Sequence, residues 1–133
     1  MKIRSALSAA FAALFAACSA PPYPVRSIED DAEAYASVVA ADESLADIVR
    51  VGRPRVTRAA GNRLSVAVPI RNIDDEQVQI LAQIEFRGDD QEPLGDSTNR
   101  QVMTIAAGAT EMMTSTSRSD AARDYVVRLF WNK

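Results

Sequence analysis

Apolar and more polar residues alternate along much of the chain after residue 60. The clearest run places Leu64, Val66, Val68 and Ile70 at every second position, and a similar run follows at 78–86. Successive side chains of a β-strand point to opposite faces of a sheet, so this period predicts strands with one buried face.

Turn-forming residues separate these two runs from weaker strands. Polar or glycine-containing turns are predicted at 61–62, 72–76 and 88–95, and further strands at 48–57, 102–106, 111–117 and 125–131. Gly52 and Pro54 interrupt the first of these, which indicates an edge strand or a bulge. About six strands joined by mostly short turns predict an all-β fold over residues 45–133. We expect a small antiparallel β-sandwich, immunoglobulin-like or similar.

The N-terminus has a different pattern, with a short basic start and an apolar run over 6–17. As a helix this run would span about 18 Å, less than the roughly 30 Å hydrocarbon core of a bilayer, so residues 1–17 are predicted to be a signal peptide. The run ends in Ala16-Ala17-Cys18, which resembles the lipobox of bacterial lipoproteins, although Phe15 replaces the usual aliphatic residue. The resemblance implies cleavage before Cys18 and lipidation of its thiol.

An ordinary secretory signal cut after Ala20 is the alternative, with Cys18 incidental. Cys18 is the single cysteine of the sequence, and an unpaired thiol is a liability in an oxidising compartment, which favours lipidation. Ser19, and not aspartate, follows the cysteine. By the usual sorting rule this resemblance implies a lipid anchor in the outer membrane, on its periplasmic face.

Residues 18–44 are predicted to be the lipidated N-terminus and a flexible or partly helical tether. Pro21, Pro22 and Pro24 favour extended chain. The alanine- and acid-rich stretch 28–46 has a few apolar residues at helical spacing, which allows either a short helix or a disordered spacer.

Composition narrows the chemistry. The 133 residues include no histidine and one cysteine, which excludes Ser-His-Asp and Cys-His catalysis, His- or Cys-based zinc sites and an internal disulfide. The formal net charge of −3 argues against a nucleic-acid partner, because such proteins usually carry a basic surplus. We expect no catalytic residues, no metal and no cofactor, and therefore no enzymatic activity.

Two charged segments are candidate contact surfaces for a partner. One is an acidic loop with Asp89 and Asp90, and the other is an arginine-rich segment with Arg53 and Arg55. The acidic loop also contains Glu92 and Asp96, so calcium binding is an alternative to a plain hairpin loop. For the arginines, which include Arg50 and Arg58, the alternatives are an anionic lipid or glycan contact and an ordinary solvent-facing strand surface.

Other residues allow more than one interpretation. Three methionines, at 103, 112 and 113, suit either copper(I) or the core of a sandwich, and the core is favoured without histidine. Glu85 with a nearby aspartate could form a glycosidase pair, but its strand context favours an exposed face residue. Trp131 is expected in the core.

Several of these features together resemble the YcfL-like family of small periplasmic lipoproteins of Gram-negative bacteria. The resemblance covers about residues 38–130 and consists of Asp42 with Leu45 and Ile48, the strand 64–70 ending in Asn72, Ile84-Glu85-Phe86 before Asp89-Asp90, Ile105 with Gly108, and the run 121–129. Departures occur at Phe86-Arg87 and Ser117-Arg118. The family has no assigned activity, so the resemblance implies an envelope β-sandwich lipoprotein and no active site.

The sequence therefore favours a non-enzymatic, membrane-anchored lipoprotein that presents a β-sandwich domain to an envelope protein or glycan in the periplasm. A periplasmic domain that binds a small ligand or metal is the alternative, followed by a peptidoglycan-active enzyme.

Overall fold

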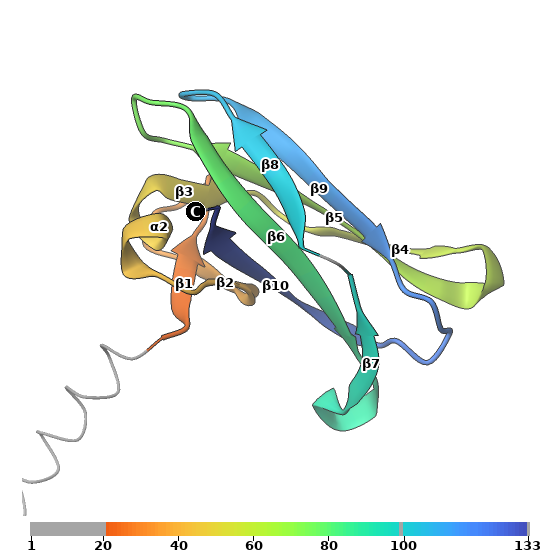
Figure 1. Cartoon of the computed structure of the whole chain (residues 1–133). Helices are drawn as coiled ribbons and strands as arrows, with labels where there is room; N and C mark the ends of the chain where they lie inside the picture. Colours follow the sequence, from red (N-terminus) through yellow and green to blue (C-terminus); the bar gives the residue numbers. More distant parts are fainter. Residues whose placement is uncertain (1–20, 99, 133) are drawn as a thin grey trace, which may run out of the picture.

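A computed structural model describes residues 21–98 and 100–132, which form two β-sheets packed face to face as a small open sandwich (Figure 1). Sheet A has the strand order β1-β2-β10-β6, and β7 and β8 follow one another along the far edge of β6. Its strands are β1 (Tyr23–Arg26), β2 (Ala34–Ala40), β6 (Val78–Arg87), β7 (Pro93–Ser97), β8 (Gln101–Ile105) and β10 (Asp124–Trp131).

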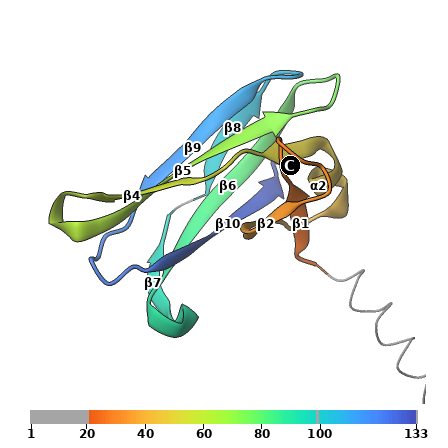
Figure 2. The ribbon, with the colours of Figure 1, turned by 180° about the vertical axis from the view of Figure 1, so that it is seen from behind.

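Sheet B is built around β5 and lies behind sheet A in Figure 1, which places it nearest the viewer in Figure 2. It contains β3 (Val49–Val51), β4 (Arg55–Ala59), β5 (Arg63–Asn72) and β9 (Thr110–Thr116). The helix α2 (Glu43–Ile48) links β2 to β3, and the short turns η1 (Ala60–Asn62) and η2 (Asp89–Gln91) follow β4 and β6. The β4–β5 hairpin projects from the end of the sandwich that lies away from β1 (Figures 1 and 2).

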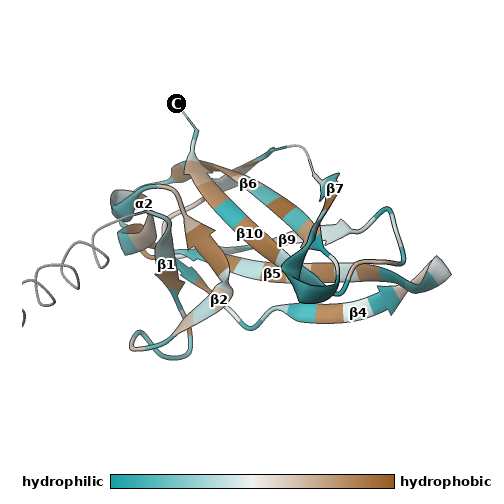
Figure 3. Ribbon diagram, turned by 90° about the horizontal axis from the view of Figure 1, so that it is seen from below, coloured by the Kyte–Doolittle hydropathy of each residue, from teal (hydrophilic) through white to brown (hydrophobic). Residues whose placement is uncertain are grey.

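The predicted alternation of β5 and β6 is confirmed. Leu64, Val66, Val68 and Ile70 are all buried on one face of β5, and β6 buries every second residue from Val78 to Phe86. Figure 3 shows the same alternation of hydropathy along β5, β6 and β10. These apolar faces meet between the sheets, and their burial is the main source of stability in a domain of this kind.

The structure differs from the tether expected at 18–44. Residues of that segment form β1 and β2, and Val25, Val38 and Ala40 are completely buried. β2 pairs with β10, and the Ile28 amide donates to the carbonyl of Val51, which ties the start of the chain to both sheets. The helix expected within 28–46 is also displaced, because α2 begins at Glu43. The few apolar residues here suffice because the existing edges of both sheets supply their partners.

The strand count and connections also differ from the prediction. The segment 48–57 divides at Gly52 and Pro54 into β3 and β4, and the loop expected at 88–95 contains η2 and the start of β7. With β1 and β2 from the expected tether, the described residues form ten strands and not six. The sandwich is not a simple meander. β5 and β6 belong to opposite sheets, as do β8 and β9, and β2 pairs with β10 in parallel, although the other paired strands of the described chain are antiparallel.

Gly52, directly after β3, packs closely against β5. A Cβ at this position would lie 2.7 Å from Cγ of Pro69, and the Gly52 amide donates to the Pro69 carbonyl at 2.9 Å. The backbone approaches β5 so closely here that only glycine fits.

No helix among residues 21–98 and 100–132 is long and apolar enough to cross a membrane.

Candidate functional site

A groove of about 510 Å³ opens where β2 and β10 begin to pair. The two strands are in register only from Val38 and Val127 onward, so the residues before these positions border an open space. Strands β2 and β10 and the end of β6 with η2 supply its lining: Tyr35, Ala36, Ser37, Arg87, Gln91, Asp124, Tyr125 and Val126.

The groove combines aromatic rings with planar polar groups. The Ser37 hydroxyl donates to the hydroxyl oxygen of Tyr125 at 3.3 Å, and burial raises the pKa of Tyr125. The Gln91 side-chain amide donates to the Asp124 carboxylate, and its carbonyl oxygen accepts from Arg87 at 3.4 Å. Tyrosine rings offer an apolar surface with a polar tip, so this lining suits a peptide segment or a sugar ring.

Glu85 lies just outside the groove, on the outer face of β6, and is held as an anion. Arg128 donates to one carboxylate oxygen at 2.7 Å and Arg87 to the other at 3.1 Å. The hydrogen bond from Arg128 is the main reason that the pKa of Glu85 is lowered, and Arg87 lowers it further. A glycosidase general acid needs a raised pKa, so this environment is the opposite of the one that role requires.

The acidic loop does not gather its carboxylates into one site. Asp89 and Asp90 are exposed in η2, next to Gln91 of the groove, whereas Asp96 is buried and accepts from the Arg118 amide at 2.7 Å. Among residues 21–98 and 100–132, no three His, Cys, Asp or Glu side chains are placed to hold a metal ion. Asp96 therefore has a structural role, since it joins β7 to the segment after β9.

The arginine-rich segment also divides. Arg53 and Arg55 are exposed and border a depression of about 310 Å³ with Glu29 and Met112. The depression lies against the outer face of sheet B, so the structure does not bring these arginines together with Asp89 and Asp90. The Ser27 hydroxyl donates to the Glu29 carboxylate and lowers its pKa, and Arg53 lowers it further.

Arg50 lies in a strand, β3, but the solvent-facing surface considered for this arginine is wrong. It is buried, its Nε donates to Asp31 at 3.0 Å, and its Nη1 lies within hydrogen-bond distance of the carbonyls of Ala46, Asp47 and Val49. Those carbonyls lie at the C-terminal end of α2, where a cation is favoured. Arg50 thus fastens α2 to the β1–β2 turn.

The methionines and Trp131 are dispersed. Met113 is in the core, Met103 is half-buried, and Met112 is exposed on the opposite face of β9 from Met113. The predicted core position is therefore confirmed for Met113 and wrong for Met112. Trp131 packs against the edge of the core, and its indole N–H donates to Ser44 at 3.0 Å.

The groove itself is not predicted from the sequence. Tyr35 belongs to the expected tether, and Tyr125 has the pattern of an ordinary core position in the last strand. Their proximity follows from the parallel pairing of β2 with β10, across almost the whole length of the domain, and no local pattern signals it. Cys18 and the predicted signal peptide lie outside the described residues.

Two solved structures share the fold of this chain. The structure resembles cj0090 of Campylobacter jejuni, with a TM-score of 0.61 and 14% identity over 74% of this chain and 100% of that one. It also resembles a DUF1425 family member from Shewanella sp. pv-4, with a TM-score of 0.52 and 12% identity over 61% of this chain and 75% of that one. No family model and no curated protein sequence matches the chain. The chain therefore shares the β-sandwich fold of these small proteins, neither of which is named as an enzyme.

Proposed function

We propose that this chain is a membrane-anchored envelope lipoprotein, similar to the YcfL-like family, that presents a non-enzymatic β-sandwich for contact with a protein or glycan in the periplasm. One observation carries the proposal. The sequence Ala16-Ala17-Cys18 closes a signal-peptide-like apolar run, and the sandwich begins at once, with β1 at Tyr23. The outer membrane is the proposed location, because Ser19 follows the cysteine.

The domain would lie close to the membrane, because no long flexible tether separates it from Cys18. Three peptide units separate Cys18 from Pro21, the first described residue, and three residues reach at most about 11 Å even when fully extended. Two or three acyl chains on Cys18 would give lasting attachment, since a single chain anchors only weakly.

The groove bordered by Tyr35 and Tyr125 is the proposed contact site for the partner. Asp89 and Asp90 adjoin it through Gln91, so they remain candidate contacts, whereas Arg53 and Arg55 would serve a separate surface on sheet B. Binding without catalysis fits a chain with no histidine, in which the Glu85 carboxylate is held in ion pairs with Arg87 and Arg128.

The anchor is tested by mass spectrometry of the mature N-terminus, which should begin with acylated Cys18. The variant Cys18→Ser should release the protein from the membrane fraction. The matched control Ser19→Ala keeps the cysteine and should stay in the membrane fraction. An unmodified chain beginning at Pro21 would contradict the proposal.

The contact site is tested with a photo-crosslinking residue in place of Ala36, inside the groove, and in place of exposed Thr114 on sheet B as the control. A discrete adduct with an envelope protein or with peptidoglycan fragments should form only from position 36. Equal adducts from both positions would argue against the groove. Cleavage of sacculi that depends on Glu85 or Asp89 would overturn the non-enzymatic proposal.

A further inference from the structure

A row of apolar side chains crosses the outer face of sheet A. Phe130 of β10 is directly opposite Leu81 of β6, and Leu81 is directly opposite Val102 of β8. This row points away from the core, because the chain neighbours Leu129, Ile80 and Ala82 are buried in it. Val102 is 60% exposed, the largest exposed fraction among the exposed large apolar side chains of the described residues.

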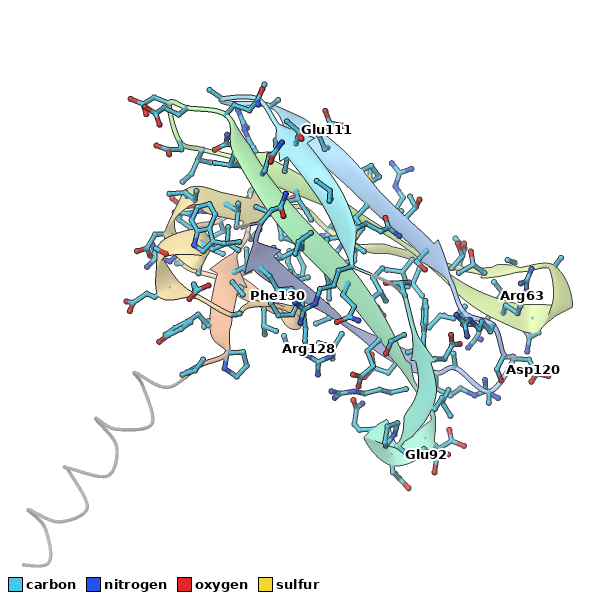
Figure 4. All side chains as sticks on the ribbon, in the orientation of Figure 1. Arg63, Glu92, Glu111, Asp120, Arg128 and Phe130 are labelled. Atoms are coloured by element: carbon cyan, nitrogen blue, oxygen red, sulfur yellow. The ribbon has the colours of Figure 1, made fainter. Side chains whose placement is uncertain are left out.

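Arginines accompany this apolar row. The guanidinium carbon of Arg100 lies 3.9 Å from the centre of the Phe130 ring. Arg128 lies two residues before Phe130 on the same face, as Figure 4 shows. The nearby carboxylate of Glu85 is already paired with Arg128 and Arg87, so its negative charge is compensated.

The start of the described chain lies on the same face. Pro21 and Pro22 border a groove of about 350 Å³ together with Val39, Ala41, Arg128 and Phe130. The lining is mostly apolar, and Arg128 and Arg87 together outnumber Glu85, so this ion-pair cluster keeps a net positive charge beside the groove. Pro21, the described residue nearest to Cys18 in the sequence, therefore lies beside Phe130 on the outer face of sheet A.

We propose that this face of sheet A, the apolar row with Arg100 and Arg128, rests on the anionic phospholipid surface that holds the anchor. The inference depends on the proposed lipidation of Cys18. An anchor within about 11 Å of Pro21 keeps the face at high effective concentration near the lipid, so even a small apolar row is enough for contact. On peripheral membrane surfaces, apolar side chains such as phenylalanine and leucine reach the acyl boundary, and neighbouring arginines meet the anionic headgroups.

This orientation has a consequence for the partner. The groove with Tyr35 and Tyr125 opens near the start of β10, and Val126 precedes Phe130 by four residues, about 13 Å along a strand. A partner in that groove would therefore sit beside the membrane, while the outer face of sheet B would look toward the periplasm.

Single labelled cysteines test the orientation in the full lipidated protein. Acylation consumes the thiol of Cys18, so Val102→Cys and the control Thr114→Cys each offer one site for a fluorophore. The proteins are reconstituted in phosphatidylethanolamine–phosphatidylglycerol vesicles that contain a headgroup-attached quencher. The label at 102 should be quenched several-fold more than the label at 114, which lies on the outer face of sheet B.

Two further measurements keep the outcomes distinct. If mass spectrometry finds acylated Cys18 but quenching is equal at positions 102 and 114, the membrane contact is wrong and the lipoprotein proposal stands. If Cys18 is not acylated, the membrane contact and the lipoprotein proposal are both wrong. A contrast that grows with the protein-to-lipid ratio would indicate a second copy on this face and would also overturn the inference. Phe130→Gln should reduce the contrast, whereas Met112→Gln on sheet B should not, with circular dichroism confirming that both variants fold.

Discussion

Asn72 shows how a single buried polar residue organises a junction of the two sheets. It has no exposed surface, and its side-chain amide donates to the carbonyls of Glu76 at 2.7 Å and Ile105 at 3.0 Å. Its side-chain oxygen accepts from the Asp74 amide at 2.9 Å. One side chain therefore shapes the β5–β6 turn and joins it to the end of β8, at the point where the chain passes from sheet B to sheet A.

The core residue Val68 gives the sharpest test of strand register. Val68→Asp should abolish cooperative folding, because an unpaired charge would be buried between the sheets. Ser65→Asp, on the opposite face of the same strand, should change the free energy of unfolding by less than about 1 kcal/mol. Thermal unfolding followed by circular dichroism distinguishes the two variants, and similar melting temperatures would show that the register is wrong.

Glu85 predicts a pH effect on stability. Its pKa is lowered in the folded state from an ordinary 4.5, so its ion pairs stabilise the fold above that pH, and the contribution is lost as the pH falls through the lowered value. Glu85→Gln should cost about 1 kcal/mol at neutral pH, since the pairs are partly exposed. The difference from the native protein should shrink in acid, measured by urea unfolding across pH, while the exposed control Glu111→Gln should show little difference at any pH.

At the scale of elements, β1 and β2 are part of the sandwich and do not form the predicted tether before it. β1 pairs with β2, β2 pairs with β10, and Ser27 bridges to Val51 of β3, so the N-terminal strands connect the edges of both sheets. The buried Val25 in β1 lies at this junction. A segment that is poor in apolar residues is thus an integral part of the domain.

Replacement of residues 22–27 by a Gly/Ser segment of equal length tests this role. Loss of the buried Val25 side chain and of the pairing with β2 should lower the free energy of unfolding by about 3 kcal/mol or more. The measurement is chemical unfolding monitored by Trp131 fluorescence. An unchanged midpoint would mean that β1 behaves as a tether.

At the scale of the whole molecule, the fold places Pro21, where the described chain begins, and the outward-facing apolar row on one face. Pro21, Pro22 and Phe130 border the same groove, while the β4–β5 hairpin lies at the far end of the sandwich (Figure 1). A short connection to an anchor therefore constrains the orientation of the domain as well as its distance from the membrane.

Lengthening that connection should release the orientation. A flexible insertion of ten Gly/Ser residues after Ala20 adds about 17 Å of root-mean-square reach, which lowers the effective concentration of the face at the membrane. The quenching contrast between labels at 102 and 114 should fall, with acylation of Cys18 unchanged. The same insertion at Gly61, in the β4–β5 turn, should leave the contrast intact; a contrast insensitive to both insertions would argue against an anchor-imposed orientation.

The sequence by itself determined the β-rich class and the buried faces of β5 and β6, it marked an irregularity at Gly52 and Pro54, and it predicts the anchor at Cys18. These follow from local rules, because alternation depends on the geometry of one strand and a lipobox on a few adjacent residues. Only the tertiary structure decided that β1 and β2 join sheet A, that β5 and β6 lie in opposite sheets, and that Arg50 is buried. The tertiary structure also places Tyr35 and Tyr125 in the lining of one groove. Each of these depends on which distant strand supplies the hydrogen-bond partners and covers the apolar face, a choice made by packing the whole chain and carried by no single segment.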